Sequence, residues 1–393
     1  MPIRRGLIKK FIAAALVLTL STVCAFLLFA PTAAFDKRLN TIHGAPIKIS
    51  DRARKLHGKL FIVDLHADSL LWSRDLLIRN ARGHVDVPRL IEGNVALQAF
   101  SIVTKVPGRK PTTKSSGIDE ISLLAVADRW PVSAWSSLKE RALYQAAKLH
   151  DFAARSKGRL SIIKTAADLA DYIKRRETDP YCTAGFLSVE GAHALDGDLN
   201  NIDVFFDHGI RMMAPSHFFD NDIGGSSSGD QRGGLTEKGR EMIRRMQEKP
   251  MIVDLAHASS ATIKDVLKIS TRPVIVSHTG VKGTCNSWRN LSDDEIIGIA
   301  KTGGVIGIGY WPEATCGHNA EAIAKAIRYA VNLAGVEHVA LGSDFDGATS
   351  VPFDSSGLVA VTQALIDSGF TDNQIRLIMG GNALRVLSAG LPK

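Results

Sequence analysis

The sequence predicts an α/β protein with the architecture of a (β/α)8 TIM-type barrel. Two observations support this fold class: eight short apolar runs rich in β-branched residues, and amphipathic segments between them. One domain over residues 55–393 fits the length, and 45% of the residues are hydrophobic, as in an ordinary globular protein. A doubly wound sheet is the alternative. It is disfavoured because no glycine-rich phosphate loop follows an early run.

The eight runs have the order and spacing of barrel strands. Most are apolar at successive positions, which is typical of parallel strands buried on both faces. They cover residues 61–66, 95–103, 183–190, 210–214, 251–257, 273–278, 304–310 and 338–344.

Helical signals fall between these runs. Residues 138–155 carry apolar side chains at helical spacing. Ser292 precedes three acidic residues, the pattern of a capped first turn, and Thr371 with Gln374 forms a capping box before the last helix. Residues 105–131, rich in Ser, Thr, Lys and Pro, predict an insertion between the second strand and its helix.

Residues 1–35 predict a signal peptide or a membrane anchor. Residues 11–30 carry no charge and are long enough to cross a bilayer as a helix. Basic residues before them favour a cytoplasmic N-terminus, so we expect the body to be exported, either periplasmic or on the extracytoplasmic face of the inner membrane. Residues 36–54 are expected to be a polar linker.

The charge balance argues against nucleic acid as a partner. Lys and Arg number 48 against 40 Asp and Glu, a formal charge of +8. Four of the basic residues precede the apolar segment, and without them the balance is 44 against 40, or +4. The body therefore lacks the strong basic excess of a nucleic-acid-binding face.

Residue types that bind metals gather where the predicted strands end. In a barrel of this kind, all strand C-termini open onto one face, so these side chains should converge there. They are His66, Asp68, Glu190, His257, His278 and Asp344, with His217 shortly after the fourth run.

The spacing of these residues suits two divalent cations. His66 and Asp68 are two positions apart on an extended run, so they share a face and can chelate one cation. Glu190 offers two oxygens that can bridge a cation pair, and His257 with His278 can complete the second site. A binuclear metal site at the C-terminal ends of the strands is therefore expected, since burying so many ionisable groups without a cation would be costly.

With these residues in place, the chain resembles the membrane dipeptidase (renal dipeptidase) family of zinc metallopeptidases, within the amidohydrolase-like barrels. The motifs that carry the resemblance run in the family's order. They are Asp64-Leu65-His66-Ala67-Asp68, Ser188-Val189-Glu190-Gly191-Ala192-His193, Asp254-Leu255-Ala256-His257, Val276-Ser277-His278, Ser287-Trp288-Arg289-Asn290, Gly342-Ser343-Asp344-Phe345-Asp346-Gly347 and Gly380-Gly381-Asn382-Ala383-Leu384-Arg385-Val386.

The resemblance implies two Zn²⁺ ions per chain. His66 and Asp68 would bind one ion, His257 and His278 the other, and Glu190 would bridge them. A hydroxide shared by the two ions would then hydrolyse dipeptides that have a free C-terminal carboxylate, with an L or D residue at that end. The resemblance also favours a disulfide between Cys285 and Cys316, and a homodimer is possible on the same ground.

The other roles implied by the resemblance concern substrate and proton transfer. Asp344 would move the proton, and His217 would polarise the scissile carbonyl and stabilise its oxyanion. Arg289 would bind the substrate carboxylate, and Tyr310 is assigned to substrate binding with Arg289 and His217. The segment 218–225 departs from the family's usual loop at this position, so substrate preference transfers least well.

Two other functions compete with this one. Another binuclear amidohydrolase, such as an N-acyl amino acid deacylase or a lactonase, would commonly bridge its metals with a carbamylated lysine, and no Lys ends a predicted strand. A non-catalytic extracytoplasmic binding barrel would be expected to lose ligands, whereas here all five ligands and Asp344 are present.

Overall fold

The computed structural model describes residues 9–19, 21–22, 32–45, 47–108 and 119–393. Its main sheet contains eight parallel strands in the order β7-β6-β5-β3-β2-β10-β9-β8, with β4 paired to β5 beside this path. A parallel bridge between Asp254 and Ile275 joins the two ends of the sheet, so the strands close in sequence order. The predicted (β/α)8 barrel is therefore confirmed. The strands are β2 (Ile62–Ala67), β3 (Val95–Val103), β4 (Leu160–Ile162), β5 (Thr183–Glu190), β6 (Ile210–Met213), β7 (Ile252–Val253), β8 (Ile275–Thr279), β9 (Val305–Ile308) and β10 (Val339–Leu341).

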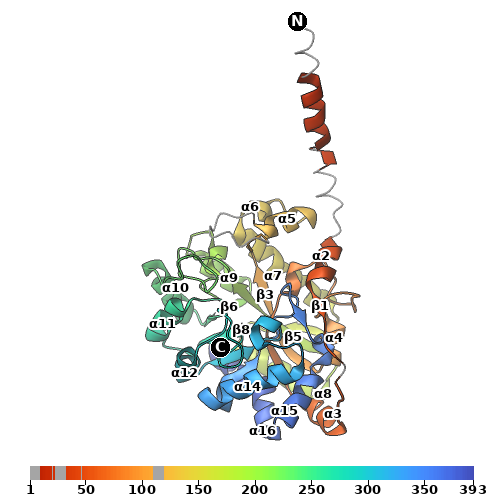
Figure 1. Cartoon of the computed structure of the whole chain (residues 1–393), viewed down its shortest axis with the longest axis vertical. Helices are drawn as coiled ribbons and strands as arrows, with labels where there is room; N and C mark the ends of the chain where they lie inside the picture. The colour runs from red at the N-terminus through yellow and green to blue at the C-terminus, as the bar shows by residue number, and fades with distance from the viewer. Residues whose placement is uncertain (1–8, 20, 23–31, 46, 109–118) are drawn as a thin grey trace.

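Helices form a layer around the sheet (Figure 1). They are α2 (Thr32–Leu39), α3 (Asp51–His57), α4 (Val87–Glu92), α5 (Glu120–Ala127), α6 (Ser133–Ser136), α7 (Leu138–Arg155), α8 (Ala166–Thr178), α9 (Asn201–Asp207), α10 (Glu237–Glu248), α11 (Ser260–Ile269), α12 (Asp293–Lys301), α13 (Pro312–Thr315), α14 (Ala320–Ala334), α15 (Val359–Asp367), α16 (Asp372–Arg376) and α17 (Asn382–Gly390). The described residues also contain the short 3-10 helices η1 (Ser69–Leu71), η2 (Ala192–Leu195), η3 (Val336–His338) and η4 (Ser355–Gly357), and the π-helix η5 (Leu377–Gly381).

Local sequence signals account for these elements. Every residue of β2, β3 and β5 is buried, as expected for parallel strands that have the barrel interior on one face and helices on the other. The helix predicted over 138–155 is α7, and α12 begins with the capped first turn predicted at Ser292, which is a capping box. The capping box predicted at Thr371 and Gln374 begins α16, which η5 and α17 follow, so it does not precede the last helix. The insertion between β3 and α7 contains α5 and α6, and part of it, residues 109–118, lies outside the described residues.

Strand β7 is shorter than predicted. The apolar run suggested residues 251–257, but the strand covers only Ile252–Val253. The backbone of His257 is left-handed, with φ of 63°, and this conformation cannot continue a strand. The chain turns at His257, beyond the end of β7, and this turn brings the imidazole of His257 to the mouth of the barrel.

The N-terminal region differs from its prediction in one respect. Residues 36–54 were expected to be a linker, but they include the second half of α2, strand β1 (Thr41–Ile42) and part of α3. Strand β1 pairs with β11 (Ser350–Val351) in a second, two-stranded parallel sheet. Backbone pairing to a distant segment therefore fixes residues whose polar composition had suggested a linker.

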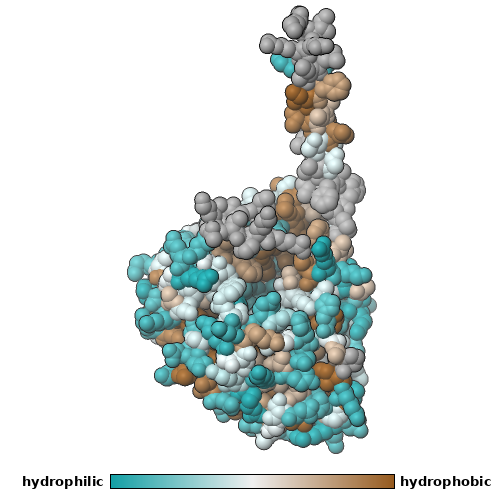
Figure 2. Space-filling model, viewed as in Figure 1, coloured by the Kyte–Doolittle hydropathy of each residue, from teal (hydrophilic) through white to brown (hydrophobic). Residues whose placement is uncertain are grey.

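Part of the predicted apolar span, residues 11–30, lies outside the described residues. Residues 9–19 are helical, and their apolar side chains contrast with the mostly hydrophilic surface of the barrel (Figure 2). Within the described part of the chain, no helix combines the length and apolar character that a membrane crossing requires.

Candidate metal centre and active site

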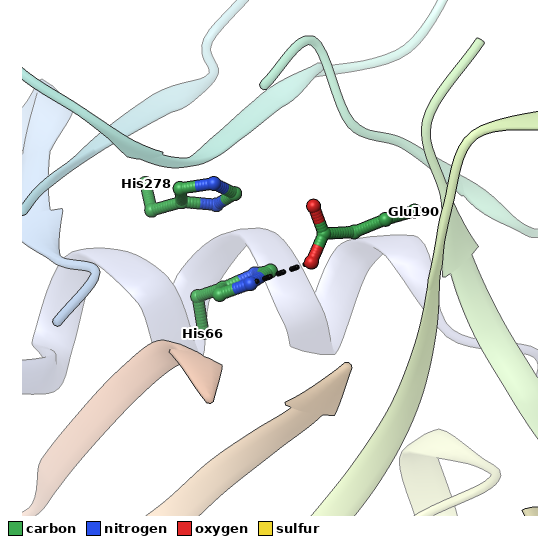
Figure 3. Close-up of side chains that lie close together, drawn as sticks. All are labelled: His66, Glu190 and His278. Carbon is green, nitrogen blue, oxygen red and sulfur yellow. Dashed lines mark ion pairs between the residues drawn. The ribbon is translucent and has the colours of Figure 1, made fainter. Parts of the chain in front are cut away.

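Ligand-type side chains from five barrel strands and the turns after them meet at one end of the barrel. His66 lies near the end of β2, Glu190 is the last residue of β5, and His278 is in β8. Figure 3 shows these three side chains converging, with the carboxylate of Glu190 directed at the imidazole of His66. His257 and Asp344 join them from the turns after β7 and β10. Residues remote in the sequence are therefore brought together as predicted.

The carboxylate of Glu190 lies at the centre of this cluster. Its Oε1 is 2.8 Å from Nε2 of His66. Its Oε2 is 2.9 Å from Nε2 of His217 and 3.2 Å from Nε2 of His257. The two oxygens thus face different histidines, which is the arrangement that a bridging carboxylate requires.

Distances between the remaining ligand atoms also fit metal coordination. Nε2 of His66 is 3.4 Å from Oδ1 of Asp68, and Nε2 of His257 is 2.9 Å from Nε2 of His278. Nitrogen and oxygen ligands about 2.0–2.2 Å from a tetrahedral zinc ion are about 3.3–3.6 Å apart. Small side-chain movements would therefore suffice to surround a cation. Nε2 of His66 and Oδ1 of Asp68 are buried in these ion-pair contacts but make no hydrogen bond among the described residues, and a metal would satisfy both.

Three groups of side chains have ligand atoms close enough to share an ion. They are His66 with Glu190 and His278, Glu190 with His217 and His257, and His66 with Asp68 and Asp344. All five residues predicted as ligands occur in these groups. The partition differs from the expected one, because His278 is grouped with His66 and because His217 is close enough to Glu190 to be a ligand itself.

The electrostatics of the cluster favour bound cations. Burial raises the pKa of Glu190, but His217 and His66 more than offset this and hold that pKa well below its usual range. Burial lowers the pKa of His66, but the adjacent carboxylates of Glu190 and Asp68 more than offset this and raise that pKa well above the ordinary value. The carboxylates thus draw positive charge to this position, which a metal ion would also supply.

The other two predicted histidine ligands are held neutral. Burial and the nearby guanidinium of Arg289 keep the pKa values of His257 and His278 well below that of free histidine. A metal-binding imidazole must be deprotonated, so this environment suits ligation. Burial raises the pKa of Asp344 well above its usual range, and the carboxylates of Asp68 and Glu190 add to the effect.

Two buried carboxylates support the cluster, and sequence reasoning gave them no role. Asp64 accepts hydrogen bonds from the backbone N–H (2.8 Å) and hydroxyl (2.6 Å) of Ser343, the residue before Asp344. Asp254 accepts from the backbone N–H groups of Ala256 (3.0 Å) and Ser277 (2.9 Å), which ties the turn before His257 to β8. Their position two or three residues before a ligand histidine was the available signal.

Ser277 orients two of the histidines directly. Its hydroxyl is 2.9 Å from Nδ1 of His278 and 3.4 Å from Nδ1 of His66. A hydrogen bond at one ring nitrogen fixes which nitrogen is available to a metal. Ser101 in β3 similarly donates to Oε1 of Glu190 at 3.2 Å.

The residues predicted to bind substrate have different surroundings. Arg289 is on the loop after β8, and its Nη2 donates to the carbonyl oxygen of His278 at 3.1 Å, which places the guanidinium beside the cluster. Tyr310 is 1% exposed and packs against Phe345 and Phe353. Its hydroxyl has no hydrogen-bond partner in the described part of the chain, so its predicted contact with substrate stays a prediction.

A disulfide joins the loops that follow β8 and β9. Cys285 and Cys316 are bonded, in agreement with the pairing that the resemblance favoured. Asn290, next to Arg289, donates to the carbonyl oxygens of Cys285 (2.8 Å) and Ala314 (3.0 Å). The loop carrying Arg289 is thus tied to the neighbouring loop covalently and by hydrogen bonds.

The barrel and its ligand cluster together define a barrel metallohydrolase. Residues 50–390 match the sequence model of the membrane dipeptidase family, peptidase family M19. The chain therefore belongs to that family of metallopeptidases, whose members are hydrolases acting on dipeptides.

Individual relatives agree with this assignment. The chain is 32% identical over 232 residues to "Dipeptidase aclJ" of Aspergillus oryzae, a match that covers 56% of this chain and about half, 55%, of that relative. Its fold is similar to that of the probable dipeptidase PvdM from Pseudomonas aeruginosa, with a TM-score of 0.73, 21% identity, and coverage of 86% of this chain and 97% of that one. A metallopeptidase from Rhodobacter sphaeroides, solved with a phosphinate mimic of the dipeptide L-Ala-D-Ala, has a TM-score of 0.68 at 23% identity, covering 84% and 99% of the two chains.

Proposed function

We propose that this protein is a zinc-dependent dipeptidase that hydrolyses dipeptides with a free C-terminal carboxylate, L-Xaa-L-Xaa or L-Xaa-D-Xaa. The observation that carries the proposal is the position of Glu190, whose two carboxylate oxygens face histidines from different strands. A guanidinium lies beside the same cluster and can bind a carboxylate.

The resemblance to the family indicates which residues would hold the metal, and the 2.9 Å between Nε2 of His257 and Nε2 of His278 supports the second pair. His66 and Asp68 would bind one zinc ion, His257 and His278 the other, and Glu190 would bridge them. Imidazole and carboxylate donors suit zinc. When bound, a pair of such ions polarises a carbonyl group and lowers the pKa of a water molecule.

Three side chains would then act on the substrate. Arg289 would bind the C-terminal carboxylate through a bidentate contact, which restricts the enzyme to very short peptides. His217 would donate a hydrogen bond to the oxygen of the scissile carbonyl as negative charge develops there. Asp344 would accept a proton from the attacking water and pass it to the nitrogen of the leaving amine. A carboxylate placed beside the cluster can make both transfers, since Oδ1 of Asp344 lies 3.9 Å from Nε2 of His66.

The role of His217 can be separated from metal binding. Because its Nε2 is 2.9 Å from Glu190, His217 could be either a ligand or a donor to the substrate. His217→Gln should lower turnover about 100- to 1000-fold with metal content unchanged, if it stabilises the oxyanion. A loss of about one metal ion per chain would instead make it a ligand.

The activity is tested by measuring the release of free amino acids from unblocked L,L and L,D dipeptides, with the full chain loaded with zinc. Chelation should abolish cleavage, and zinc should restore it. N-acetylated dipeptides should remain intact. Cleavage of the acetylated substrates alone would instead indicate a deacylase, and a folded, zinc-loaded protein that cleaves neither set would contradict the proposal.

Export is part of the same proposal. The apolar residues 11–30 follow a basic segment, and a disulfide between Cys285 and Cys316 is typical of an oxidising compartment. Cell fractionation should recover the protein outside the cytoplasm, in the periplasm or bound to the inner membrane. Recovery in the cytoplasm with both cysteines reduced would contradict export.

A further inference from the structure

Residues 32–43 form a strap along the barrel beside the active site. The strap consists of α2, Asn40, β1 and His43, and it lies before residues 50–390, the region that matches the family. It packs closely against the body, because Leu39 contacts the apolar cluster that contains Trp72 and Ile121, and the hydroxyl of Thr32 donates to the carboxylate of Asp128.

The strap contacts the segment that carries Asp344. This segment, residues 344–351, contains three residues other than glycine with left-handed backbones: Asp344, Asp346 and Ala348, with φ of 60°, 63° and 58°. L-residues adopt this conformation only at a cost in free energy, and it persists where surrounding contacts impose it. The geometry of the Asp344 turn therefore depends on partners outside the segment.

Three backbone positions of the segment bind the strap directly. The side-chain oxygen of Asn40 accepts a hydrogen bond from the backbone N–H of Ala348 at 2.9 Å. The N–H of Thr41 donates to the carbonyl oxygen of Thr349 at 3.2 Å, and the N–H of His43 donates to that of Val351 at 2.9 Å. Because the partner of β1 in its small sheet is β11, these bonds end if the strap leaves.

Two buried side chains connect the strap to Asp346 from the loop between η1 and α4. The guanidinium of Arg74 lies 3.1 Å from the carboxylate of Asp36 through Nε and 2.7 Å from that of Asp346 through Nη2. The ring of His84 accepts from the N–H of Asp346 through Nδ1 (3.0 Å), and its Nε2 is 3.3 Å from the carbonyl oxygen of Thr41. Arg74 is 4% exposed and His84 is fully buried, so neither can replace a lost partner with water.

From these contacts we infer that the strap positions Asp344, with Asn40, Arg74 and His84 as positioning residues for the proton-transfer step. The inference rests on the proposed function, because positioning Asp344 affects catalysis only if Asp344 transfers a proton. A carboxylate that must reach both a water and the leaving amine tolerates little displacement, since misplacement by about 1 Å can cost about 100-fold in rate.

The test compares two variants of the full chain that each remove one hydrogen bond from a side chain to a backbone N–H. Asn40→Ala deletes the acceptor for the N–H of Ala348 and, within the strap, the bond from Nδ2 of Asn40 to Oδ1 of Asp36 (2.9 Å), and it leaves the backbone pairing of β1 in place. Asn319→Ala is the matched control, because it deletes the cap of α14, a bond to the N–H of Ala322, without touching the segment 344–351. Both lose one side-chain to backbone hydrogen bond, so a general loss of stability affects both.

The expected result is specific to Asn40→Ala. The amide of Ala348 should exchange its hydrogen faster, and kcat should fall about tenfold or more, with KM for a dipeptide and zinc content unchanged. Asn319→Ala should keep the wild-type kcat. Faster exchange at Ala348 with an unchanged kcat would overturn the inference, and so would unchanged exchange.

A second variant covers failure of the first to fold. Asp36→Asn keeps the shape of the side chain but removes the charge that faces Arg74, and the same split between kcat and KM is expected. Absence of turnover in the wild-type chain would refute the proposed function. If the wild-type chain is active and both strap variants keep its kcat, the role of the strap in positioning Asp344 would be refuted and the proposed function would stand.

Discussion

Replacing Arg289 by lysine tests how the site recognises the substrate. Nη2 of Arg289 donates to the carbonyl oxygen of His278, and its Nε and Nη1 make no hydrogen bond or ion pair within the described residues. Those groups remain available to a carboxylate. A lysine ammonium keeps the charge but cannot form two parallel hydrogen bonds to one carboxylate.

The size of the effect follows from the loss of one charge-assisted hydrogen bond, which is worth about 1.5–3 kcal/mol. At about 1.4 kcal/mol for each factor of ten, KM for a free dipeptide should rise about 10- to 150-fold. The carboxylate does not react, so ground state and transition state lose the contact equally, and kcat should change little.

The assay measures initial rates for one dipeptide and for its C-terminal amide, with the wild-type chain and with Arg289→Lys. The amide should be a poor substrate for both, and the variant should lower kcat/KM for the free acid only. Arg272→Lys is the matched control, because Arg272 lies before β8 and binds the carbonyl oxygen of Ala389. An equal loss for acid and amide would refute carboxylate recognition by Arg289.

Three further predictions follow from the site and the core. Asp344→Asn should retain the metal and lose about 100- to 10,000-fold in turnover; metal analysis beside kinetics checks both parts, and near-normal turnover would exclude proton transfer by this residue. Chelation should lower the free energy of unfolding by about 2.7 kcal/mol for each site held at 100 times its Kd, which thermal unfolding with zinc restoration measures; an unchanged midpoint in metal-free protein would count against buried metal sites. Burial lowers the pKa of His57 to about 4 in the folded chain, from about 6.5 in the unfolded chain. Between these two pH values the unfolded chain binds more protons than the folded chain. Roughly 3 kcal/mol of stability that is present above this range is therefore lost as the pH falls through it. His57→Gln should flatten that decline in a series of denaturant titrations, and an equally steep decline in the variant would assign it to other groups.

The barrel could be predicted because its signals are local. The runs at 95–103 and 183–190 coincide with β3 and β5, since a strand buried on both faces is apolar along its whole length. The position of the site then follows from topology, because parallel strands of a barrel all end at one face. This is why His66 and His278, far apart in the chain, could be expected to meet.

The strap could not be predicted because its structure depends on distant partners. Strand β1 has two residues, and its pairing requires Ser350 and Val351, near the other end of the chain. Arg74 and His84 gave no signal either, since Arg74 contacts both Asp36 and Asp346, and His84 contacts both Thr41 and Asp346. Composition correctly shows such a segment as polar and says nothing about its contacts.

The sequence predicts which ligand residues converge, but it does not predict the backbone conformation that places two of their side chains. His257 and Asp344 both have left-handed backbones, with φ of 63° and 60°, in the turns after β7 and β10. Single residues other than glycine in this region cost about 1–2 kcal/mol, so a position that keeps His or Asp there gains something that glycine could not provide. At His257 the gain is an imidazole turned back over the barrel mouth to within 3.2 Å of Glu190. At Asp344 it is a carboxylate 3.9 Å from Nε2 of His66, beside the metal ligands and outside their expected set. Strand periodicity predicted which residues converge, but these two turns determine how the ligand atoms are distributed around Glu190, and no periodicity encodes them.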